Sequence, residues 1–261
     1  MATIESHSSY LFVFAHPDDE IHCTSLMQRS LATGKIVTVV FLTDGDLGTN
    51  PEQRKNEISA SMNAIGVKPS NTFRLSIPEA EVLSRFLEIA QAIGEIAKKQ
   101  PPDCVIGMDY EGGHEGHDSA SFFASETARL LACPFYVFPA YHLEKDKRKN
   151  GTFLTGRRAT DTILLTDKEV ELKITALEAH KGQIDHFFQL QRQSPDYFKR
   201  LFTREIFRLV SRPYDYLQPP APQVRYEKHQ NGHAFKDFYH AVHAYYRAAP
   251  VPAVPQDHKV L

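Results

Sequence analysis

Two short polar segments combine histidines with carboxylates in a pattern that suits a metal ion. The first, AHPDDE, follows the apolar run YLFVF and contains His16, Asp18 and Asp19. The second, HEGH, contains His114 and His117. Carboxylates packed this closely repel one another unless a cation lies among them. Taken together, the two segments predict a bound divalent cation.

Three of these side chains form the predicted ligand set. His16, Asp19 and His117 supply two imidazoles and one carboxylate and leave a position open to water, which is typical of catalytic zinc. Imidazole ligands favour zinc, iron or nickel over magnesium. Such a site keeps a net charge of about +1 and lowers the pKa of bound water to about 7. Asp18 is then a candidate general base, and His114 could stabilise an oxyanion or protonate a leaving amine.

Each segment also has a simpler interpretation. An isolated H-x-x-H pair occurs often by chance. A D-D-E run is commonly a charge cluster in the first turn of a helix, and Glu20 fits that interpretation because the helix dipole favours a carboxylate there. The metal hypothesis therefore depends on the strands that bring the two segments to one place.

Strand and helix signals alternate over the first half of the chain. Short apolar runs predict buried strands, and amphipathic runs bounded by Pro, Gly or Asp predict helices. This alternation is typical of an α/β fold with a mostly parallel, doubly wound sheet. The predicted strands lie near residues 10–15, 35–43, 71–77, 103–109 and 134–140, and the predicted helices near 24–34, 51–66, 79–100 and 118–132.

The usual strand order of such a sheet, 3-2-1-4-5, makes the first and fourth strands neighbours. The loop after the first strand is AHPDDE, and the loop after the fourth is DYEGGHEGHDS. Ligands bind at the carboxyl ends of parallel strands, where the strand order reverses. The topology therefore predicts that the two polar loops face each other.

The alternation of strand and helix signals becomes less regular in the second half of the chain. A strand at Thr162–Leu165 precedes a helix that begins near Thr166 or Asp167, whereas LFTREIFRLVS fits either a strand or a short helix. A PPAP stretch reads as a linker, and HAFKDFYHAVHAYYRAA predicts one more helix. We predict one main domain over residues 1–210 and a C-terminal extension, residues 211–261, packed on or beside it.

Composition narrows the class of protein. The 261 residues carry 30 basic and 32 acidic side chains, so the charge balance gives no indication of nucleic-acid binding. No apolar run reaches the roughly 18–20 residues that span a bilayer, and no basic segment precedes the first apolar run as in a signal peptide. Cys23, Cys104 and Cys133 are widely spaced and predict buried, reduced thiols. We expect a cytoplasmic protein.

The polar segments also resemble a known family. AHPDDE is similar to the signature of the LmbE/PIG-L family of zinc-dependent N-deacetylases, and HEGH is similar to that family's second signature. Between them, LTDGDLG and RKNE resemble its T-D-G turn and its R-x-x-E pair, here Arg54 and Glu57. Later, KITALEAHKGQ is similar to a helix motif that includes Lys173, His180 and Gln183.

The resemblance implies a Rossmann-like three-layer sandwich and a hydrolase for N-acyl groups, usually the acetamide of an N-acetylglucosamine-type sugar. It implies one zinc ion per chain, held by His16, Asp19 and His117. Asp18 would act as the general base that takes a proton from the metal-bound water, and His114 would stabilise the oxyanion.

Two further residues are implied to bind the substrate. Arg54 would contact it and His180 would form part of the site wall, although Arg54 and Glu57 could instead be a surface pair on a helix. IHCTSLMQ departs from the Gly-rich segment common in the family, and Gly116 replaces the Asn or Asp before the final histidine. Larger side chains such as His22 would narrow the space behind the site.

The leading hypothesis is a deacetylase whose partner is a small N-acetylated sugar or sugar conjugate, with no nucleic acid and no integral membrane segment. The oligomeric state stays open, and a homo-oligomer is one option. A metal-dependent phosphoesterase would need further carboxylates about 4 Å from the first metal, for which Asp44 and Asp46 are the obvious donors. A nucleotide-binding module is disfavoured because the first turn lacks G-x-G-x-x-G.

One further alternative is a protein that binds sugar without catalysis, and the remaining polar residues have simple structural explanations. A family member that has lost activity would serve as a sugar-binding protein. The basic run KDKRK, Lys145–Lys149, is expected to be a solvated loop. His240 and His243, three residues apart on the last predicted helix, are expected to be solvated rather than to bind a second metal.

Overall fold

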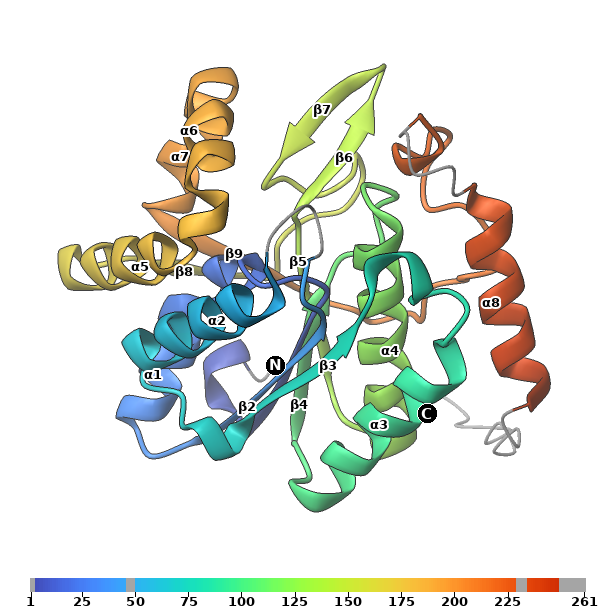
Figure 1. Cartoon of the computed structure of the whole chain (residues 1–261), viewed down its shortest axis with the longest axis horizontal. Coiled ribbons are helices and arrows are strands. Elements are labelled where there is room, and N and C mark those ends of the chain that lie inside the picture. Colours follow the sequence, from blue (N-terminus) through green and yellow to red (C-terminus); the bar gives the residue numbers. More distant parts are fainter. Residues whose placement is uncertain (1–2, 46–49, 229–233, 249–261) are drawn as a thin grey trace, which may run out of the picture.

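A mostly parallel sheet organises the chain. The computed structural model describes residues 3–45, 50–228 and 234–248. Its strands are β1 (Ser9–Phe14), β2 (Ile36–Thr43), β3 (Thr72–Ile77), β4 (Cys104–Met108), β5 (Phe135–Phe138), β6 (Tyr141–Glu144), β7 (Lys147–Asn150), β8 (Asp161–Leu164) and β9 (Arg204–Leu209). Seven of them form the sheet in the order β3-β2-β1-β4-β5-β9-β8, and β6 and β7 form a separate hairpin (Figure 1).

The predicted order of the first five strands is confirmed. Strands β1 to β5 pair in parallel, whereas β9 pairs antiparallel with both β5 and β8. LFTREIFRLVS, which the pattern left undecided, contains strand β9. Strand β1 is buried along almost its whole length, as its apolar run predicts for a strand covered on both faces.

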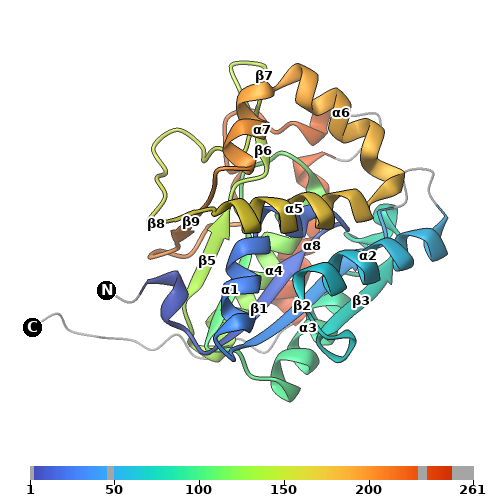
Figure 2. The same ribbon diagram turned by 90° about the vertical axis from the view of Figure 1, so that its left-hand side faces the viewer.

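Helices cover both faces of the sheet and complete the three-layer sandwich (Figures 1 and 2). Helices α1, α2 and α5 contact one another on one face, and α3 and α4 contact each other on the opposite face. The helices are α1 (Thr24–Ala32), α2 (Pro51–Ile65), α3 (Phe86–Lys99), α4 (Glu115–Leu131), α5 (Asp167–Ala179), α6 (Ile184–Gln193), α7 (Pro195–Leu201) and α8 (Phe235–Ala248).

The C-terminal segment packs on the main domain. Helix α8 contacts α3 and α4, and its apolar residues Phe238 and Val242 are buried against them. The boundary at residue 210 stays a prediction. Of the histidines in this segment, His229 and His233 lie outside the described residues. Among the helices that the structure describes, none is both long and apolar enough to cross a bilayer.

Two helix starts differ from the predictions. Helix α4 begins at Glu115, three residues before the predicted Asp118, because the His114 side chain acts as its N-cap and accepts a hydrogen bond from the backbone N–H of Gly116. Helix α3 begins at Phe86 rather than near residue 79. A separate 3-10 turn, Glu79–Glu81, precedes helix α3. This turn directs the Glu79 side chain toward His16.

The basic run KDKRK is mostly exposed, as predicted, but it does not form a loop. Its residues form the turn and second strand of the β6–β7 hairpin, which projects beyond the sheet in Figure 1. Lys145 and Asp146 form the tight turn with φ values of 50° and 60°, as a two-residue hairpin connection requires. The run gave no strand signal because its charged residues show no apolar alternation.

A buried ion pair fixes α5 and β9 against the start of α1. Lys173 Nζ lies 2.8 Å from Glu205 Oε1, and both side chains are fully buried. The two carboxylate oxygens of Glu205 also accept the backbone N–H groups of Ser25 and Leu26 at 2.8 and 3.0 Å. The Glu205 carboxylate therefore caps a helix N-terminus, where the dipole favours negative charge.

We expect Lys173→Met to lower the free energy of unfolding by about 3–5 kcal/mol, because the buried Glu205 carboxylate would lose its cation. Urea denaturation followed by circular dichroism measures this loss. Lys168→Met, at an exposed position of the same helix, is the matched control and should change stability by less than about 0.5 kcal/mol. Equal stability of the two variants would contradict the assigned role.

Candidate active site

The two polar loops meet at the carboxyl ends of β1 and β4, as the topology predicts. His16 and Asp19 come from the loop after β1, and His117 lies in the first turn of α4. His117 Nε2 lies 3.2 Å from His16 Nδ1 and 3.5 Å from Asp19 Oδ1, and His16 Nδ1 lies 3.7 Å from Asp19 Oδ2. These are the three residues predicted as metal ligands.

The donor set fits a zinc ion. With bonds of about 2.0–2.2 Å, the corners of a tetrahedron around zinc are separated by about 3.3–3.6 Å. The separations between the donor atoms of His16, Asp19 and His117, 3.2 to 3.7 Å, bracket this range. Their ligand atoms all lie within 4.8 Å of one another. Two imidazoles with one carboxylate also leave a coordination position for water or substrate.

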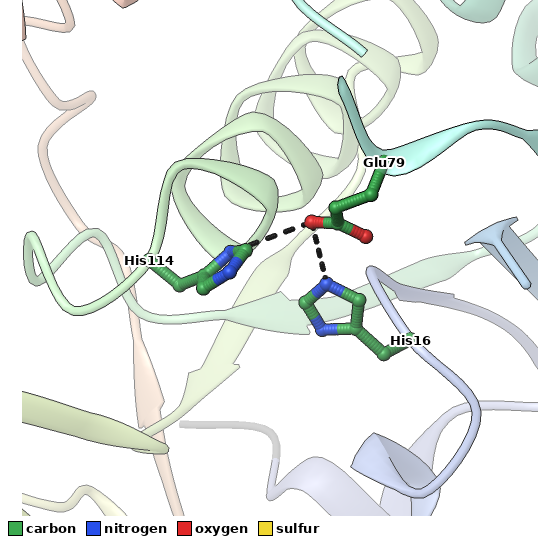
Figure 3. A group of neighbouring side chains, drawn as sticks. All are labelled: His16, Glu79 and His114. Carbon is green, nitrogen blue, oxygen red and sulfur yellow. Dashed lines mark hydrogen bonds and ion pairs between the residues drawn. The ribbon is translucent and has the colours of Figure 1, made fainter. Parts of the chain in front are cut away.

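Glu79 orients two of the histidines and was not predicted from the sequence. Its Oε1 lies 2.9 Å from His16 Nε2 and 3.6 Å from His114 Nδ1 (Figure 3). A carboxylate that accepts the Nε2–H of His16 leaves Nδ1 free to face Asp19 and His117. The available signal was its position just after β3, because the carboxyl end of β3 lies at the same edge of the sheet.

Electrostatics show why the cluster suits a cation. Burial and the neighbouring Asp18 carboxylate raise the pKa of Asp19 to about 7, although His16 opposes this. Burial would also raise the pKa of Glu79, but His16 and His114 lower it to about 2. Burial holds the pKa of His117 well below its usual range, so its imidazole stays neutral and able to bind a metal.

Asp18 lies beside the three predicted ligands in an uncommon backbone conformation. Its φ is 105° and its ψ is −17°, a left-handed conformation that residues other than glycine rarely adopt. The Asp18 N–H donates to Glu20 Oε2 at 2.8 Å, and the Asp18 carbonyl accepts from the N–H of Ile21 at 3.2 Å. Burial raises the pKa of Asp18, whereas the charges of His180 and Arg54 lower it.

Glu20 and His180 support the loop that contains Asp18, because Glu20 contacts both His180 and the Asp18 backbone. Glu20 Oε1 lies 2.5 Å from both Ser61 Oγ and His180 Nε2, and all three side chains are buried. Glu20 lies in a 3-10 turn, Asp19–His22, and not in the first turn of the following α-helix, as the sequence had suggested. The His180 imidazole is fully buried and faces Glu20. This geometry favours a positioning role over the predicted substrate contact.

Arg54 also supports this loop. Its NH2 donates to the Pro17 carbonyl at 3.1 Å, its NH1 to Glu57 Oε2 at 2.9 Å, and its Nε to the Asp44 carbonyl at 3.1 Å. The side chain of Arg54 is only 2% exposed, so its pair with Glu57 is not the surface pair considered as an alternative. The arrangement favours positioning of the Asp18 loop over direct contact with substrate.

His114 is the N-cap residue at the start of α4. Its Nδ1 accepts the backbone N–H of Gly116 at 3.0 Å. In the neutral tautomer the proton is then on Nε2, which can donate to a developing oxyanion. The His114 and His16 rings pack edge to face, with their centroids 4.9 Å apart. All five residues predicted as ligands or catalytic groups are therefore brought together.

A pocket lined by Asp18, Asp19 and His117 takes most of its other walls from later parts of the chain. His22, which the sequence predicted would narrow the site, stacks on Phe138 with ring centroids 5.3 Å apart and lines this pocket. Its pKa falls to about 3 because it is buried. The other lining residues are Asp18, Asp19, Ile21, His117, Ala140, Tyr141, Arg148, Asn150, His186, Phe187, Leu190, Tyr197 and Leu201.

Solved structures of known proteins share this fold. The N,N′-diacetylchitobiose deacetylase of Pyrococcus horikoshii superposes with a TM-score of 0.58 at 19% identity, covering 79% of this chain and 85% of that one. A deacetylase of teicoplanin biosynthesis gives 0.58 at 13% identity, covering 78% and 100%. The 4-carboxy-2-hydroxymuconate hydratase of Pseudomonas putida gives 0.53 at 16% identity, covering 79% and 98%.

The sequence itself adds a family assignment. None of the curated proteins matches it. Residues 11–128, however, match the model of the PIG-L family, described as GlcNAc-PI de-N-acetylase. That segment runs from β1 into α4 and includes every predicted ligand and catalytic residue. Residues 11–128 are therefore similar to a PIG-L (LmbE-like) domain.

Proposed function

We propose that the protein is a zinc-dependent hydrolase that removes the N-acetyl group from an N-acetylglucosamine-type sugar or sugar conjugate. Two observations carry this proposal together. The ligand atoms of His16, Asp19 and His117 lie within 4.8 Å of one another, and Asp18, Asp19 and His117 line one pocket. One zinc ion per chain would be held by the two imidazoles and the Asp19 carboxylate.

Each residue then has a distinct task. When bound, zinc supplies a Lewis acid that activates water and polarises the acyl carbonyl. Asp18, which lines the pocket next to the ligands, accepts a proton from the attacking water. His114 donates through Nε2 to the oxygen that becomes negative. Glu79, Glu20 and Arg54 act indirectly, because each holds one of these groups in place.

The relatives support a deacetylase. The chitobiose and teicoplanin proteins are deacetylases by name, and the family model is named for a de-N-acetylase. The hydratase on the same fold has a different reaction, so the fold alone does not decide the chemistry. The acid–base pair of Asp18 and His114 around the predicted ligands is the feature that favours hydrolysis of an amide.

The phosphoesterase hypothesis has less support. Asp44, one of its two suggested donors, lies 2.7 Å from the guanidinium of Arg74 and accepts from Ser76. Its other donor, Asp46, lies outside the described residues. Glu79 reaches His16 by a direct hydrogen bond of 2.9 Å, which suits an orienting carboxylate better than a bridge between two metals.

Acetate release from a panel of N-acetylated sugars and sugar conjugates tests the function, with Asp18→Asn as the decisive variant. We expect this variant to lower kcat by about 10²–10⁴-fold, because the amide cannot accept the proton of the attacking water. Asp196→Asn, at an exposed position of α7, is the control and should retain full turnover. Near-normal kcat in Asp18→Asn would exclude Asp18 as the general base.

We expect Glu79→Gln to weaken zinc binding by about 10–100-fold, because an amide oxygen orients and polarises His16 less strongly than a carboxylate. Competition with a chromogenic chelator measures the affinity. Glu81→Gln changes an exposed carboxylate two residues away and should leave the affinity unaltered. If both variants bound zinc as tightly as the wild type, Glu79 would have no part in orienting a ligand.

A further inference from the structure

Two arginines lie over one aromatic ring beside the predicted metal ligands. The guanidinium carbon of Arg148, on β7, lies 4.0 Å from the centroid of the Tyr141 ring, and that of Arg225 lies 5.1 Å from it. The Tyr141 ring packs edge-on against His117, with centroids 5.0 Å apart. We call Tyr141, Arg148 and Arg225 the arginine cluster.

In the part of the chain that the structure describes, no carboxylate pairs with either arginine of this cluster. Arg148 donates through Nε to the neutral Asn150 Oδ1 at 2.7 Å, which leaves its two terminal nitrogens for other partners. The Arg225 backbone N–H donates to the Gly112 carbonyl. Within the described residues, neither guanidinium has a carboxylate oxygen within 4 Å.

Several other shielded arginines in the described part of the chain are paired with carboxylates, whereas Arg200 donates to the Asn150 carbonyl. Arg157 and Arg208 both form ion pairs with Asp109, at 2.9 and 3.0 Å. Arg54 pairs with Glu57 at 2.9 Å. A pair of cations held together in a partly buried position repel each other, and an anion between them would relieve this repulsion.

The surroundings of the cluster agree with such a site. Arg148 lines the same pocket as Asp18, Asp19 and His117. Burial lowers the pKa of Arg148, and the like charge of Arg225 lowers it further. Asn150 and His186 line the pocket beside Arg148 and add neutral hydrogen-bonding groups.

Building on the proposed deacetylase function, we propose that Arg148 and Arg225 form an anion subsite and that the N-acylated substrate carries a carboxylate or a phosphate outside its acyl group. A guanidinium binds either group through two parallel hydrogen bonds. Both arginines lie beyond the family match, which ends at residue 128. The subsite therefore determines which conjugate this chain accepts, whereas residues 11–128 supply the chemistry.

Charge-matched substrates test the subsite. N-acetylglucosamine is the neutral probe, its 1-phosphate and 6-phosphate are the phosphate probes, and N-acetylmuramic acid is the carboxylate probe. We expect at least one anionic probe to exceed the neutral one by about 10–100-fold in kcat/KM, the range expected of hydrogen bonds between charged groups. Whichever anionic class is preferred identifies the group that the arginines bind.

Variants of the two arginines test whether the cluster causes the preference for anionic probes. Arg148→Gln should reduce the ratio of anionic to neutral kcat/KM to near 1, and Arg225→Gln should reduce it in part. Arg148→Lys should retain part of the ratio, which shows that the hairpin remains folded. Lys147→Gln removes an exposed cation one residue away and should leave the ratio unaltered. A ratio that persists in both glutamine variants would overturn the proposal.

Calorimetric binding of the amine products separates this proposal from the deacetylase function. Glucosamine 6-phosphate, glucosamine 1-phosphate and muramic acid are compared with glucosamine, because their binding needs no turnover. If an anionic amine binds more tightly and Arg148→Gln abolishes the difference, the subsite stands even when no probe releases acetate. If acetate is released but neither binding nor kcat/KM depends on the anionic group, the anion-subsite proposal is wrong. The proposed deacetylase function would still be supported by the release of acetate.

Discussion

Buried negative charge at one edge of the sheet is the constraint on which the site depends. Glu20 and Glu79 are balanced by histidines, since Glu20 contacts the buried His180 and Glu79 lies between His16 and His114. Asp18 and Asp19 remain beside the pocket, and burial raises the pKa of both. A divalent cation beside them would favour their ionised forms, and it would find three donor atoms already arranged around it. These contacts between histidines and glutamates do more than neutralise charge, because they also orient His16 and the loop that carries the proposed general base, Asp18.

The fold divides this task between two parts of the chain. The parallel strands and their loops, within residues 11–128, place the predicted ligands and catalytic groups at the carboxyl ends of β1 and β4. Later elements, the β6–β7 hairpin with helices α6 and α7, form the walls of the pocket. Both parts meet at Tyr141, whose ring contacts His117 and the guanidinium of Arg148. Substrate selection can therefore change in the later elements without altering the residues that carry out the chemistry.

The sequence predicted those features that depend on local pattern and on topology. The apolar run before His16 predicted a buried strand, and the strand order brought His16 and His117 together. Features that depend on tertiary burial were not predicted. The position of Glu79 just after β3 was a signal, but the neighbouring Glu81 in the same acid-rich stretch shares it. The burial of Arg54 and His180 follows from the packing of α2 and α5 around the Asp18 loop. The hairpin that carries Arg148 was missed because a run of charged residues does not show the alternation of a strand.

Metal content, measured by elemental analysis on protein purified without a histidine tag, tests most directly whether the carboxylates and histidines form a metal site. The wild type and His117→Ala should be compared, because His117 is the one predicted ligand that lies on α4. We expect about one zinc ion per chain in the wild type, consistent with a single tetrahedral site, and its loss in the variant. No bound metal after zinc is supplied, or zinc that His117→Ala retains in full, would contradict the assignment of His16, Asp19 and His117 as a metal centre.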